Sequence, residues 1–358
     1  MLVTGGAGFI GANFVRLALE KTDAKVVVMD KLTYAGREEN LASVSSHPRY
    51  AFVRGDIADR TAVARVLDEF EPLRILNFAA ETHVDRSIDN PRVFLETNVG
   101  GVFELLEGAR SLLERSGDRF RDQFRFLHVS TDEVFGSLGP TGLFSETSPY
   151  APNSPYSASK ASADHLVRAY HHTYGMPVLI THASNNYGPF QLPEKLVPLM
   201  VLTALEGRDL PIYGDGSQVR DWIYVGDHCE GLLRVLNGGR PGESYNIGAG
   251  CERSNLDTVE AICRVLEEER PASSNEALQA RGLGSYLELR KFVEDRPGHD
   301  QRYAIDATKV RSELSWQPQL SFEEGLRDTV RWYLQNRDWC RAVAADRLTE
   351  RVGLRKRT

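Results

Sequence analysis

The sequence predicts a doubly wound α/β fold, in which helices cover both faces of a parallel sheet and a smaller mixed α/β domain is attached to it. Two observations predict this arrangement. Through the first half of the 358-residue chain, short apolar runs alternate with longer amphipathic segments, as they do in βαβ units. After about residue 184 the alternation weakens, and turn-rich segments such as Asn185-Asn186-Tyr187-Gly188-Pro189 replace it.

The apolar runs give the strands of the sheet, and the segments between them give its helices. The expected strands are Leu2–Thr4, Lys25–Met29, Ala51–Arg54, Arg74–Phe78, Phe124–Ser130 and Val178–His182. The expected helices are Gly11–Lys21, Arg60–Glu71, Pro91–Arg115 and Ser157–Tyr174. Because a crossover between parallel strands is right-handed, this order winds the chain over both faces of the sheet.

The rest of the chain is expected to belong mainly to the second domain. The expected boundaries are 1–184 with a returning segment at about 219–248 for the first domain, and 185–218 with 249–358 for the second. In the returning segment Asp221–Asn237 is predicted to be a helix, and Ser244–Ile247 a strand that rejoins the sheet. The polar stretch Pro271–Gly284 is predicted to be a surface loop, and the arginine-rich last twenty residues a terminal helix and a mobile tail.

The composition excludes several classes of function. A net charge of -7 and a pI of about 5.8 give no basis for a nucleic-acid or membrane-surface partner. No apolar run approaches the roughly 18 residues that span a bilayer. The four cysteines are scattered without a CxxC spacing, so we expect neither a zinc site nor a disulfide framework, and no metal. A cytoplasmic location is the simplest expectation.

The first chemical motif is the glycine cluster Gly5-Gly6-Ala7-Gly8-Phe9-Ile10-Gly11, which follows the first strand and opens the first helix. Glycines at this place let backbone N–H groups approach a pyrophosphate at the positive end of the helix, as in Rossmann-type domains. Asp30 stands 19 residues after Gly11, at the end of the second strand. A carboxylate there accepts hydrogen bonds from the adenosine ribose and repels a 2′-phosphate, which favours NAD over NADP. Lys31 weakens that exclusion slightly.

The third and fourth strands also end in candidate cofactor residues. Asp56-Ile57 follows the third strand, where an aspartate can bind the adenine amino group. A helix N-cap for Arg60–Glu71 is an equally good interpretation of Asp56. Phe78-Ala79-Ala80 ends the fourth strand with small residues, which allow the backbone to pass close to a cofactor.

Tyr156 and Lys160 place a phenol and an ammonium four residues apart on one helical face. A phenol titrates near 10 in water, so it needs help to act as a base. A lysine cation and a nicotinamide cation nearby would lower its pKa, and such a tyrosine can take the proton of an alcohol while hydride moves to NAD. The spacing alone is common by chance; its position after the glycine cluster gives it weight.

Together these motifs resemble the extended short-chain dehydrogenase/reductase superfamily, and more narrowly the dTDP-glucose 4,6-dehydratases. The narrower resemblance extends over nearly the whole chain, from residue 2 to about 335. It rests on five blocks, which are Asp30–Gly36, Ala79–Ile88, Ser130–Gly136, Asn185–Gln191 and Asp295–Asp300.

The resemblance implies a catalytic role for Thr131-Asp132-Glu133, after the fifth strand. Loss of water across C5 and C6 of a 4-ketosugar needs a base for the C5 proton and an acid for the C6 hydroxyl. By resemblance Glu133 is that base and Asp132 that acid, while Thr131 holds the C4 oxygen. Tyr156, with Lys160, would oxidise C4, and the hydride would return from the cofactor to C6. In isolation, two solvated acids at a strand end would be the simpler interpretation.

The resemblance also extends to the residues that bind the two ligands. The implied NAD-binding residues are Gly5, Gly8, Phe9, Ile10, Gly11, Asp30, Lys31, Leu32, Thr33, Asp56, Ile57, Phe78, Ala79, Ala80, Thr97, Tyr156, Lys160 and Asn186. The implied residues for the substrate, dTDP-glucose, are Thr82, Thr131, Asn185, Lys195, Leu196, Pro211, Ile212, Tyr213, Arg220, Asn255, Arg296 and His299. For Lys195 a solvated charge, and for Arg220 a structural ion pair with its neighbour Asp221, are the competing interpretations.

Three alternative functions stay open on the sequence. A 4,6-dehydratase could act on another nucleotide sugar, such as UDP-glucose. A 4-epimerase is disfavoured because Asp132 and Glu133 would have no task, and a non-catalytic NAD-binding protein is disfavoured because Tyr156 and Lys160 are both present. The helices Pro91–Arg115 and Ser157–Tyr174 are apolar on more than one face, which favours a homodimer.

Overall fold

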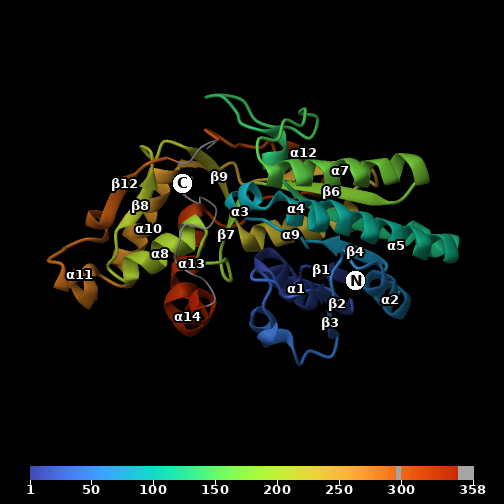
Figure 1. The fold of residues 1–358 in the computed structure, drawn as a ribbon, viewed down its shortest axis with the longest axis horizontal. Coiled ribbons are helices and arrows are strands. Elements are labelled where there is room, and N and C mark those ends of the chain that lie inside the picture. The colour runs from blue at the N-terminus through green and yellow to red at the C-terminus, as the bar shows by residue number, and fades with distance from the viewer. Residues whose placement is uncertain (296–299, 346–358) are drawn as a thin grey trace.

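A computed structural model describes residues 1–295 and 300–345 of the chain. A parallel seven-stranded sheet with helices on both faces forms its larger part, and shorter strands and helices form a smaller part beside it (Figure 1). This is the Rossmann-like α/β fold that the sequence predicts. The strand order is β10-β6-β5-β4-β1-β2-β3. The order reverses beside β1, which is where ligands bind in sheets of this kind.

The seven strands are short, and the central ones are almost wholly buried. Their bounds are β1 Leu2–Thr4, β2 Val26–Asp30, β3 Tyr50–Arg54, β4 Arg74–Asn77, β5 Arg125–Thr131, β6 Val178–Ala183 and β10 Ser244–Ile247. The strand predicted to return to the sheet does so, since Ser244 pairs with Ile180 in parallel register. Burial on both faces explains why these strands are continuous apolar runs without alternation.

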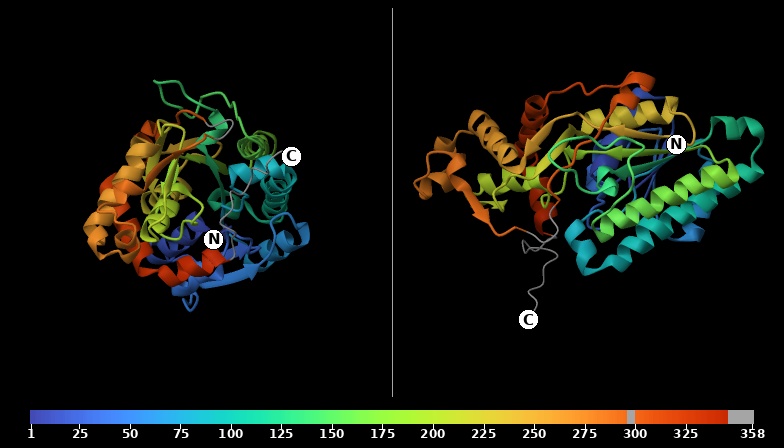
Figure 2. Two further views of the ribbon diagram at one scale, coloured as in Figure 1. Left: turned by 60° about the vertical axis from the view of Figure 1, so that its left-hand side comes forward. Right: turned by 90° about the horizontal axis from the view of Figure 1, so that it is seen from above.

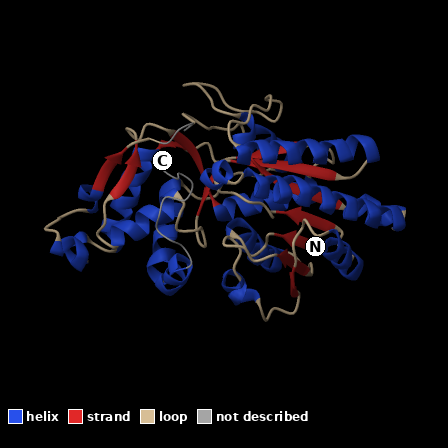
Figure 3. Ribbon diagram, in the orientation of Figure 1, coloured by secondary structure: helices blue, strands red, loops and turns tan. Residues whose placement is uncertain are grey.

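Helices cover both faces of the sheet (Figure 3), and an apolar cluster lies under each layer of helices. One contains side chains of α1 and α9, and the other contains side chains of α2, α5 and α7. The helical segments of this part are α1 Phe9–Lys21, η1 Glu38–Val44, α2 Arg60–Phe70, α3 Val84–Asp89, α4 Pro91–Phe94, η2 Leu95–Gly101, α5 Val102–Arg115, α6 Asp118–Gln123, η3 Asp132–Phe135, α7 Pro155–Tyr174 and α9 Val225–Gly238.

The smaller part has its own apolar cluster, built around α8, α10 and α13, and lies to the left of the large sheet in Figure 1. Its strands are β7 Asn185–Tyr187, β8 Leu210–Tyr213, β9 Val219–Tyr224, β11 Glu252–Ser254 and β12 Arg290–Val293, in a three-stranded sheet β11-β9-β7 and a two-stranded sheet β12-β8. Its helical segments are α8 Leu196–Leu205, α10 Asn255–Glu269, η4 Ala272–Ser274, α11 Glu276–Ala280, η5 Tyr286–Leu289, α13 Phe322–Gln335 and α14 Arg337–Ala345. The helix α12 Thr308–Leu314 packs instead against α9 and β10 of the larger part, where Val310 is buried in the cluster of α1 and α9.

Local sequence signals fix the ends of α7, the helix that carries Tyr156 and Lys160. The Ser154 hydroxyl accepts a hydrogen bond from the N–H of Ser157, whose side chain caps the Ser154 N–H in return, and Pro155 occupies the first turn. Gly175, in the left-handed conformation at φ 62°, ends the helix. Figure 2 shows α7 as the long helix at the edge of the molecule, beside α5.

Three sequence predictions about elements are wrong in part. Asp221–Tyr224 is not helical but belongs to β9 of the smaller sheet, so the segment that returns to the large domain begins with α9. The predicted single helix Pro91–Arg115 contains the π-helical segment η2. The predicted loop Pro271–Gly284 contains the short helices η4 and α11.

Within the described residues no helix has both the length and the apolar character needed to cross a bilayer.

Candidate active site

A cleft opens at the carboxyl ends of the central strands, where the strand order reverses. Residues of β2, β5 and β6, the turn after β1, the segment after β4, and the segment between β7 and α8 line it. Its empty space is about 1560 Å³, including the open mouth. Its lining joins the turn after β1 to the segment that carries Asn185 and Lys195 in one continuous space.

The turn between β1 and α1 tolerates only glycine at two of its positions. A Cβ on Gly5, which has a φ of +67°, would lie 2.5 Å from the backbone nitrogen of Ala79. A Cβ on Gly11 would lie 2.4 Å from the Gly5 carbonyl oxygen. These contacts bring the turn, the segment after β4 and the first turn of α1 together at the floor of the cleft. The backbone there fits the diphosphate of NAD, as the glycine pattern predicts.

Asp30 is buried at the end of β2, and both of its carboxylate oxygens are held by backbone. One accepts a hydrogen bond from the N–H of Ala7 at 3.0 Å, the other from that of Leu32 at 2.8 Å. Burial raises the pKa of Asp30, while these two hydrogen bonds and Lys31 oppose the increase. The carboxylate has further lone pairs for ribose hydroxyls, and it lines the cleft.

The two interpretations of Asp56 are separated by the structure. The N-cap of α2 is Asp59, whose side chain accepts hydrogen bonds from Thr61 and Ala62. Asp56 instead accepts from the N–H of Ala58 at 2.9 Å and faces the cleft, with Lys31 Nζ 3.4 Å from its carboxylate. The N-cap interpretation is wrong, and Asp56 stays a candidate cofactor residue.

The acidic doublet lies in η3, directly after β5. Asp132 is buried, and one of its oxygens, Oδ2, has no hydrogen-bond partner among the described residues. The other, Oδ1, accepts a hydrogen bond from the Thr131 hydroxyl at 3.2 Å. Burial, followed by repulsion from Glu133 and Asp221, raises the pKa of Asp132 well above its usual value. This environment favours the protonated form of Asp132, the form that an acid for a leaving hydroxyl needs.

Tyr156 is also buried in the cleft, against the doublet. Burial, and then the charges of Glu133 and Asp132, hold its pKa above the usual value, while a hydrogen bond with Thr131 acts in the opposite direction. The prediction that Lys160 lowers the pKa of this phenol does not hold for the protein by itself. The reason is that the carboxylates oppose ionisation and that Lys160 is engaged elsewhere.

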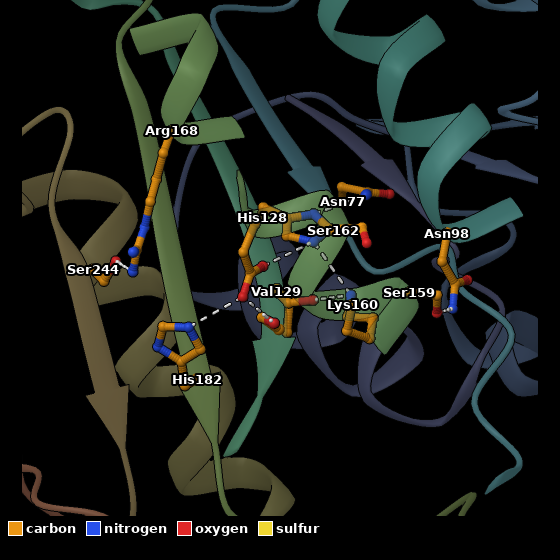
Figure 4. Close-up of polar contacts among 12 residues, drawn as sticks. Asn77, Asn98, His128, Val129, Ser159, Lys160, Ser162, Arg168, His182 and Ser244 are labelled. Atoms are coloured by element: carbon orange, nitrogen blue, oxygen red, sulfur yellow. Dashed lines mark hydrogen bonds and ion pairs between the residues drawn. The ribbon is translucent and has the colours of Figure 1, made fainter. Parts of the chain in front are cut away.

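Lys160 points into the protein beneath the cleft (Figure 4). Its Nζ donates to the carbonyl oxygen of Val129 at 2.8 Å and lies 3.3 Å from Nε2 of His128. Burial lowers the pKa of Lys160 to about 8, and Asp164 opposes that decrease. The ammonium is thus fixed in place, with a proton that is held only weakly.

Most of the predicted site residues meet in this cleft. All five catalytic candidates line it, as do all the NAD candidates except Leu32, which donates its N–H to Asp30. Four substrate candidates line it too, namely Thr82, Thr131, Asn185 and Lys195. Lys195 is not simply solvated, since its Nζ lies 3.4 Å from the carbonyl oxygen of Thr82. The described residues contain no group of three or more His, Cys, Asp or Glu side chains placed to hold a metal ion.

The remaining substrate candidates are not brought together with these. The residues outside the lining of the cleft are Leu196, Pro211, Ile212, Tyr213, Arg220 and Asn255, while Arg296 and His299 fall outside the described residues. Ile212 is buried in the apolar cluster of the smaller part. Arg220 lies over the ring of Tyr303 and donates to the carbonyl oxygen of Asp300 at 3.0 Å, whereas Asp221 accepts the N–H of Cys251.

Several lining residues were not anticipated. The set includes Glu81, Ser130, Ser184, Gln191 and His228. Ser130 lies near the end of β5, and Ser184 directly follows β6. Their position at the ends of apolar strands is a signal that the sequence contains. His228 comes from α9, and its Nδ1 lies 2.9 Å from Oδ1 of Asn186. Nothing local in the sequence marks this pairing, because the two residues are 42 positions apart.

Comparison with known proteins shows what the chain is similar to. The family model described as GDP-mannose 4,6 dehydratase matches residues 2–329. A dTDP-glucose 4,6-dehydratase of Xanthomonas campestris pv. campestris (strain B100) is 55% identical over 342 residues, 96% of this chain and 95% of the relative. The dTDP-glucose 4,6-dehydratase 1 of Escherichia coli (strain K12) is 51% identical over 348 residues, 95% of this chain and 94% of that one.

Solved structures agree with the sequence relatives. DesIV, a dTDP-glucose 4,6-dehydratase from Streptomyces venezuelae with NAD and TYD bound, superposes with a TM-score of 0.84 at 46% identity, over 96% of this chain and 99% of that one. A Thermus thermophilus UDP-glucose 4-epimerase in complex with NAD superposes with a TM-score of 0.78 at 29% identity, over 94% and 99% of the two chains.

Proposed function

Because this chain belongs to the dTDP-glucose 4,6-dehydratases of the extended short-chain dehydrogenase/reductase superfamily, we propose that its cleft binds NAD and dTDP-glucose side by side and that Thr131, Asp132, Glu133, Tyr156 and Lys160 carry the reaction. The protein is an enzyme, a hydro-lyase that converts dTDP-glucose to its 4-keto-6-deoxy derivative. The observation that carries this proposal is the buried Asp132, with its raised pKa, in one cleft with Glu133 and Tyr156.

Oxidation of C4 comes first. Tyr156 takes the proton of the C4 hydroxyl, and Thr131 holds the same oxygen by a hydrogen bond. NAD, when bound, supplies the positive charge that favours the Tyr156 phenolate, accepts the C4 hydride and later returns it to C6. The protein alone keeps the phenol protonated, so oxidation is coupled to an occupied cofactor site.

Loss of water follows at C5 and C6. The 4-ketone acidifies the C5 hydrogen, which Glu133 removes, while Asp132 gives its proton to the departing C6 hydroxyl. Hydride addition at C6 and reprotonation of C5 by Glu133, whose carboxyl proton exchanges with solvent, complete the product. Tyr156 then holds one proton more than at the start and Asp132 one fewer. Thr131, which is hydrogen-bonded to both side chains, lies on the route between them.

The substrate is recognised from the second side of the cleft. We place the hexose against Thr82 and Asn185, and the nucleotide beyond Lys195, with Asn186 held toward the cofactor by His228. Leu196, Pro211, Ile212, Tyr213, Arg220, Asn255, Arg296 and His299 stay candidates for the nucleotide and diphosphate. This assigns catalysis to a first domain, residues 1–184 with the segment from α9 to β10, and recognition to the rest.

A homodimer and a cytoplasmic location complete the proposal. Ile88, Leu95 and Phe103 are exposed apolar side chains on α3, η2 and α5. Together with α7 they give a face suited to a second copy of the chain. Light scattering that reports a monomer at micromolar concentration would contradict the dimer.

The product of a nucleotide-sugar panel tests the function. The protein is incubated in deuterated solvent with dTDP-, UDP- or GDP-glucose, and the masses of the products are measured by mass spectrometry. We expect loss of water and gain of one solvent deuteron at C5, with dTDP-glucose preferred. A product of unchanged mass would indicate epimerisation, and bound NAD without turnover of any sugar would indicate a non-catalytic protein.

A further inference from the structure

Behind Lys160 lies a buried cluster of ionisable groups that the reaction above does not use. It is centred on Asp164, one helical turn after Lys160 on α7 and fully buried. The Asp164 carboxylate accepts hydrogen bonds from the hydroxyls of Ser130 at 2.8 Å and Tyr150 at 2.9 Å. Nε2 of His182 lies 3.3 Å from it, and Nε2 of His128 lies 3.5 Å from it. Burying a charge costs free energy, which hydrogen-bond partners offset only in part. A buried carboxylate with this many partners therefore suggests a functional role.

The hydrogen bonds around His128 show which way it donates. Nδ1 of His128 lies 3.1 Å from the amide nitrogen of Asn77, whose amide oxygen accepts the Thr4 hydroxyl. With Asn77 in this orientation, Nδ1 is an acceptor and the imidazole proton is on Nε2. Nε2 then cannot accept from Lys160, and it faces Asp164, whose Oδ1 lies 3.5 Å away without a hydrogen-bond partner among the described residues. His128 is neutral, since burial lowers its pKa to about 3.

Asp164 is therefore the anion nearest to the Lys160 ammonium within this cluster. Burial alone would raise its pKa, but the hydrogen bond from His182 and the charges around it lower that pKa to about 2. The opposite charge matters to Lys160 because the only other named partners of its Nζ are the Val129 carbonyl and a neutral His128. Figure 4 shows His128 and Lys160 close together, with His182 on the far side of the cluster.

We propose that Asp164 is a positioning residue for the C4 oxidation: it keeps Lys160 protonated in a site that excludes water, so that Lys160 can support the Tyr156 phenolate. Asp164 does not touch the substrate or cofactor cleft, and it acts through Lys160 alone. The inference rests on the proposed function, because only an oxidation step gives Lys160 its task.

The direction of the effect separates this role from a direct one. Removal of the Asp164 charge by itself favours the phenolate slightly, because a nearby negative charge raises the pKa of Tyr156. Loss of the Lys160 proton has the opposite effect. The other ionisable groups around this centre are Asp132 and Glu133 on η3, His128 on β5, His182 on β6, Tyr150 in the segment before α7, and Arg168 on α7, which donates to the Tyr150 hydroxyl. Glu133 is replaced by Gln in every protein used for the oxidation test below, and the other groups are retained in all of them.

The test measures the pH dependence of the oxidation step alone. In a Glu133→Gln background the cycle stops at the 4-ketone, and the NADH absorbance after mixing NAD-loaded protein with dTDP-glucose reports hydride transfer. The rate of NADH formation should rise with pH, and this rise is called the ascending limb. Introducing Asp164→Asn is expected to move the ascending limb to higher pH by about one unit or more. In a Lys160→Met background the same substitution should give no upward shift. Asp164→Glu, which keeps the charge, should restore the limb toward its original position.

The control is Asp227→Asn, which alters a buried carboxylate that binds the N–H groups of Gln319 and Leu320. It should change the melting temperature without moving the limb. A downward or absent shift in Asp164→Asn, or an upward shift of equal size with and without Lys160, would overturn the proposal. Failure of the Glu133→Gln protein to form NADH at all would instead refute the proposed function.

A second measurement does not require the Asp164 variants to fold. If Asp164 and Lys160 form a pair of opposite charges, Lys160→Met leaves Asp164 uncompensated, and its carboxylate becomes harder to ionise. Because the pKa of Asp164 is about 2 in the folded protein and about 4 in an unfolded chain, the melting temperature lost in this variant, relative to the unaltered protein, should grow as the pH rises from about 2 to 5. A loss that is constant over this range would overturn the proposal.

Discussion

The two sides of the cleft are built in different ways. On the catalytic side, every candidate stands at the end of a buried strand or in the first turns of the helix that follows, as Gly5, Asp30, Asp132 and Tyr156 do. On the nucleotide side, the candidates are spread over β7, α8, β8, β9 and α10, and several do not reach the cleft. Residues 296–299, which carry two more of them, lie outside the described chain.

The difference teaches which property each side contributes. Parallel strands converge at one edge of a sheet and fix their terminal residues within a rigid frame, which suits groups that must meet reacting atoms. Recognition of a nucleotide tolerates longer, separate connections, because its binding energy is the sum of several contacts. We therefore expect substitutions on the catalytic side to lower kcat steeply, and those on the nucleotide side to raise KM mildly.

The largest effect is expected at the reacting groups. Glu133→Gln and Tyr156→Phe should each lower kcat by about 10²–10⁴-fold, since each removes a proton-transfer group. Initial rates with dTDP-glucose and the NAD content of the purified protein are measured together. Glu107→Gln, which alters a carboxylate paired with Arg110 on α5, is the control and should leave kcat unchanged. A comparable loss in that control would remove the contrast between the two sides.

The glycine turn should show the next largest effect. Gly11→Ala places a Cβ 2.4 Å from the Gly5 carbonyl oxygen, so the turn must shift. Overpacking costs about 1–3 kcal/mol, and NAD affinity should fall about tenfold or more. The matched control is Gly139→Ala, where a Cβ would meet nothing within 4 Å. Calorimetric titration with NAD compares the two, and equal affinities would show that the turn does not hold the cofactor.

Substitution of Asp30, on the same side of the cleft, should have a smaller effect on cofactor binding. Asp30→Asn removes the charge that binds ribose hydroxyls and repels a 2′-phosphate. NAD affinity should fall by about 1–3 kcal/mol, and the preference for NAD over NADP should fall with it. Equilibrium binding of both cofactors gives the ratio. A variant with an unchanged ratio would mean that another group, such as Lys31, sets the selectivity.

Asp132 links catalysis to stability, because its contribution to the free energy of unfolding depends on pH. Its pKa in the folded protein is raised, so folding takes up a proton once the unfolded chain has lost it. Stability from this group is complete below the usual carboxyl pKa and declines as the pH rises toward the folded value. Asp132→Asn removes that decline. The melting temperature of the variant, relative to that of the unaltered protein, should therefore be higher at pH 7 than at pH 5. A difference that shrinks with rising pH would contradict the buried acid.

The smallest effect is expected on the nucleotide side. Lys195→Met removes a partly exposed ammonium near the Thr82 carbonyl. A partly screened charge contributes about 1 kcal/mol or less, so KM for dTDP-glucose should rise less than about tenfold with kcat unchanged. Lys291→Met, on the exposed strand β12, is the control. A large fall in kcat for Lys195→Met would place this lysine among the reacting groups.

The same division explains what the sequence could predict. The glycine turn, Asp30, the acidic doublet and the Tyr156–Lys160 pair are local patterns, and the sheet brings them together in the expected place. Asp221–Tyr224 was mistaken for the start of a helix because it adjoins α9 and its partners in the sheet, Asn185–Tyr187 and Glu252–Ser254, are distant in sequence. Pairing between distant strands has no local signal.

The cluster behind Lys160 shows a similar limit. The spacing of Lys160 and Asp164 on one helix is visible in the sequence. The partners that ionise Asp164 and hold it, Ser130, Tyr150 and His182, come from three other segments. The hydrogen bond from His182 and the charge of Lys160 help to give the aspartate its low pKa against the effect of burial, and both depend on the packing of α7 against β5 and β6.

The π-helical segment Leu95–Gly101 changes the direction in which side chains point along one continuous helical run. Its wider turn accommodates an extra residue, and so rotates everything before it relative to everything after it. Thr97 and Asn98 lie in this segment: Thr97 contacts Lys31, and Asn98 contacts Glu81 and Ser159, whereas α5 beyond it packs against α2 and α7. The wider turn thus lets one continuous helical run contribute both to the ligand cleft and to the packing of the larger part.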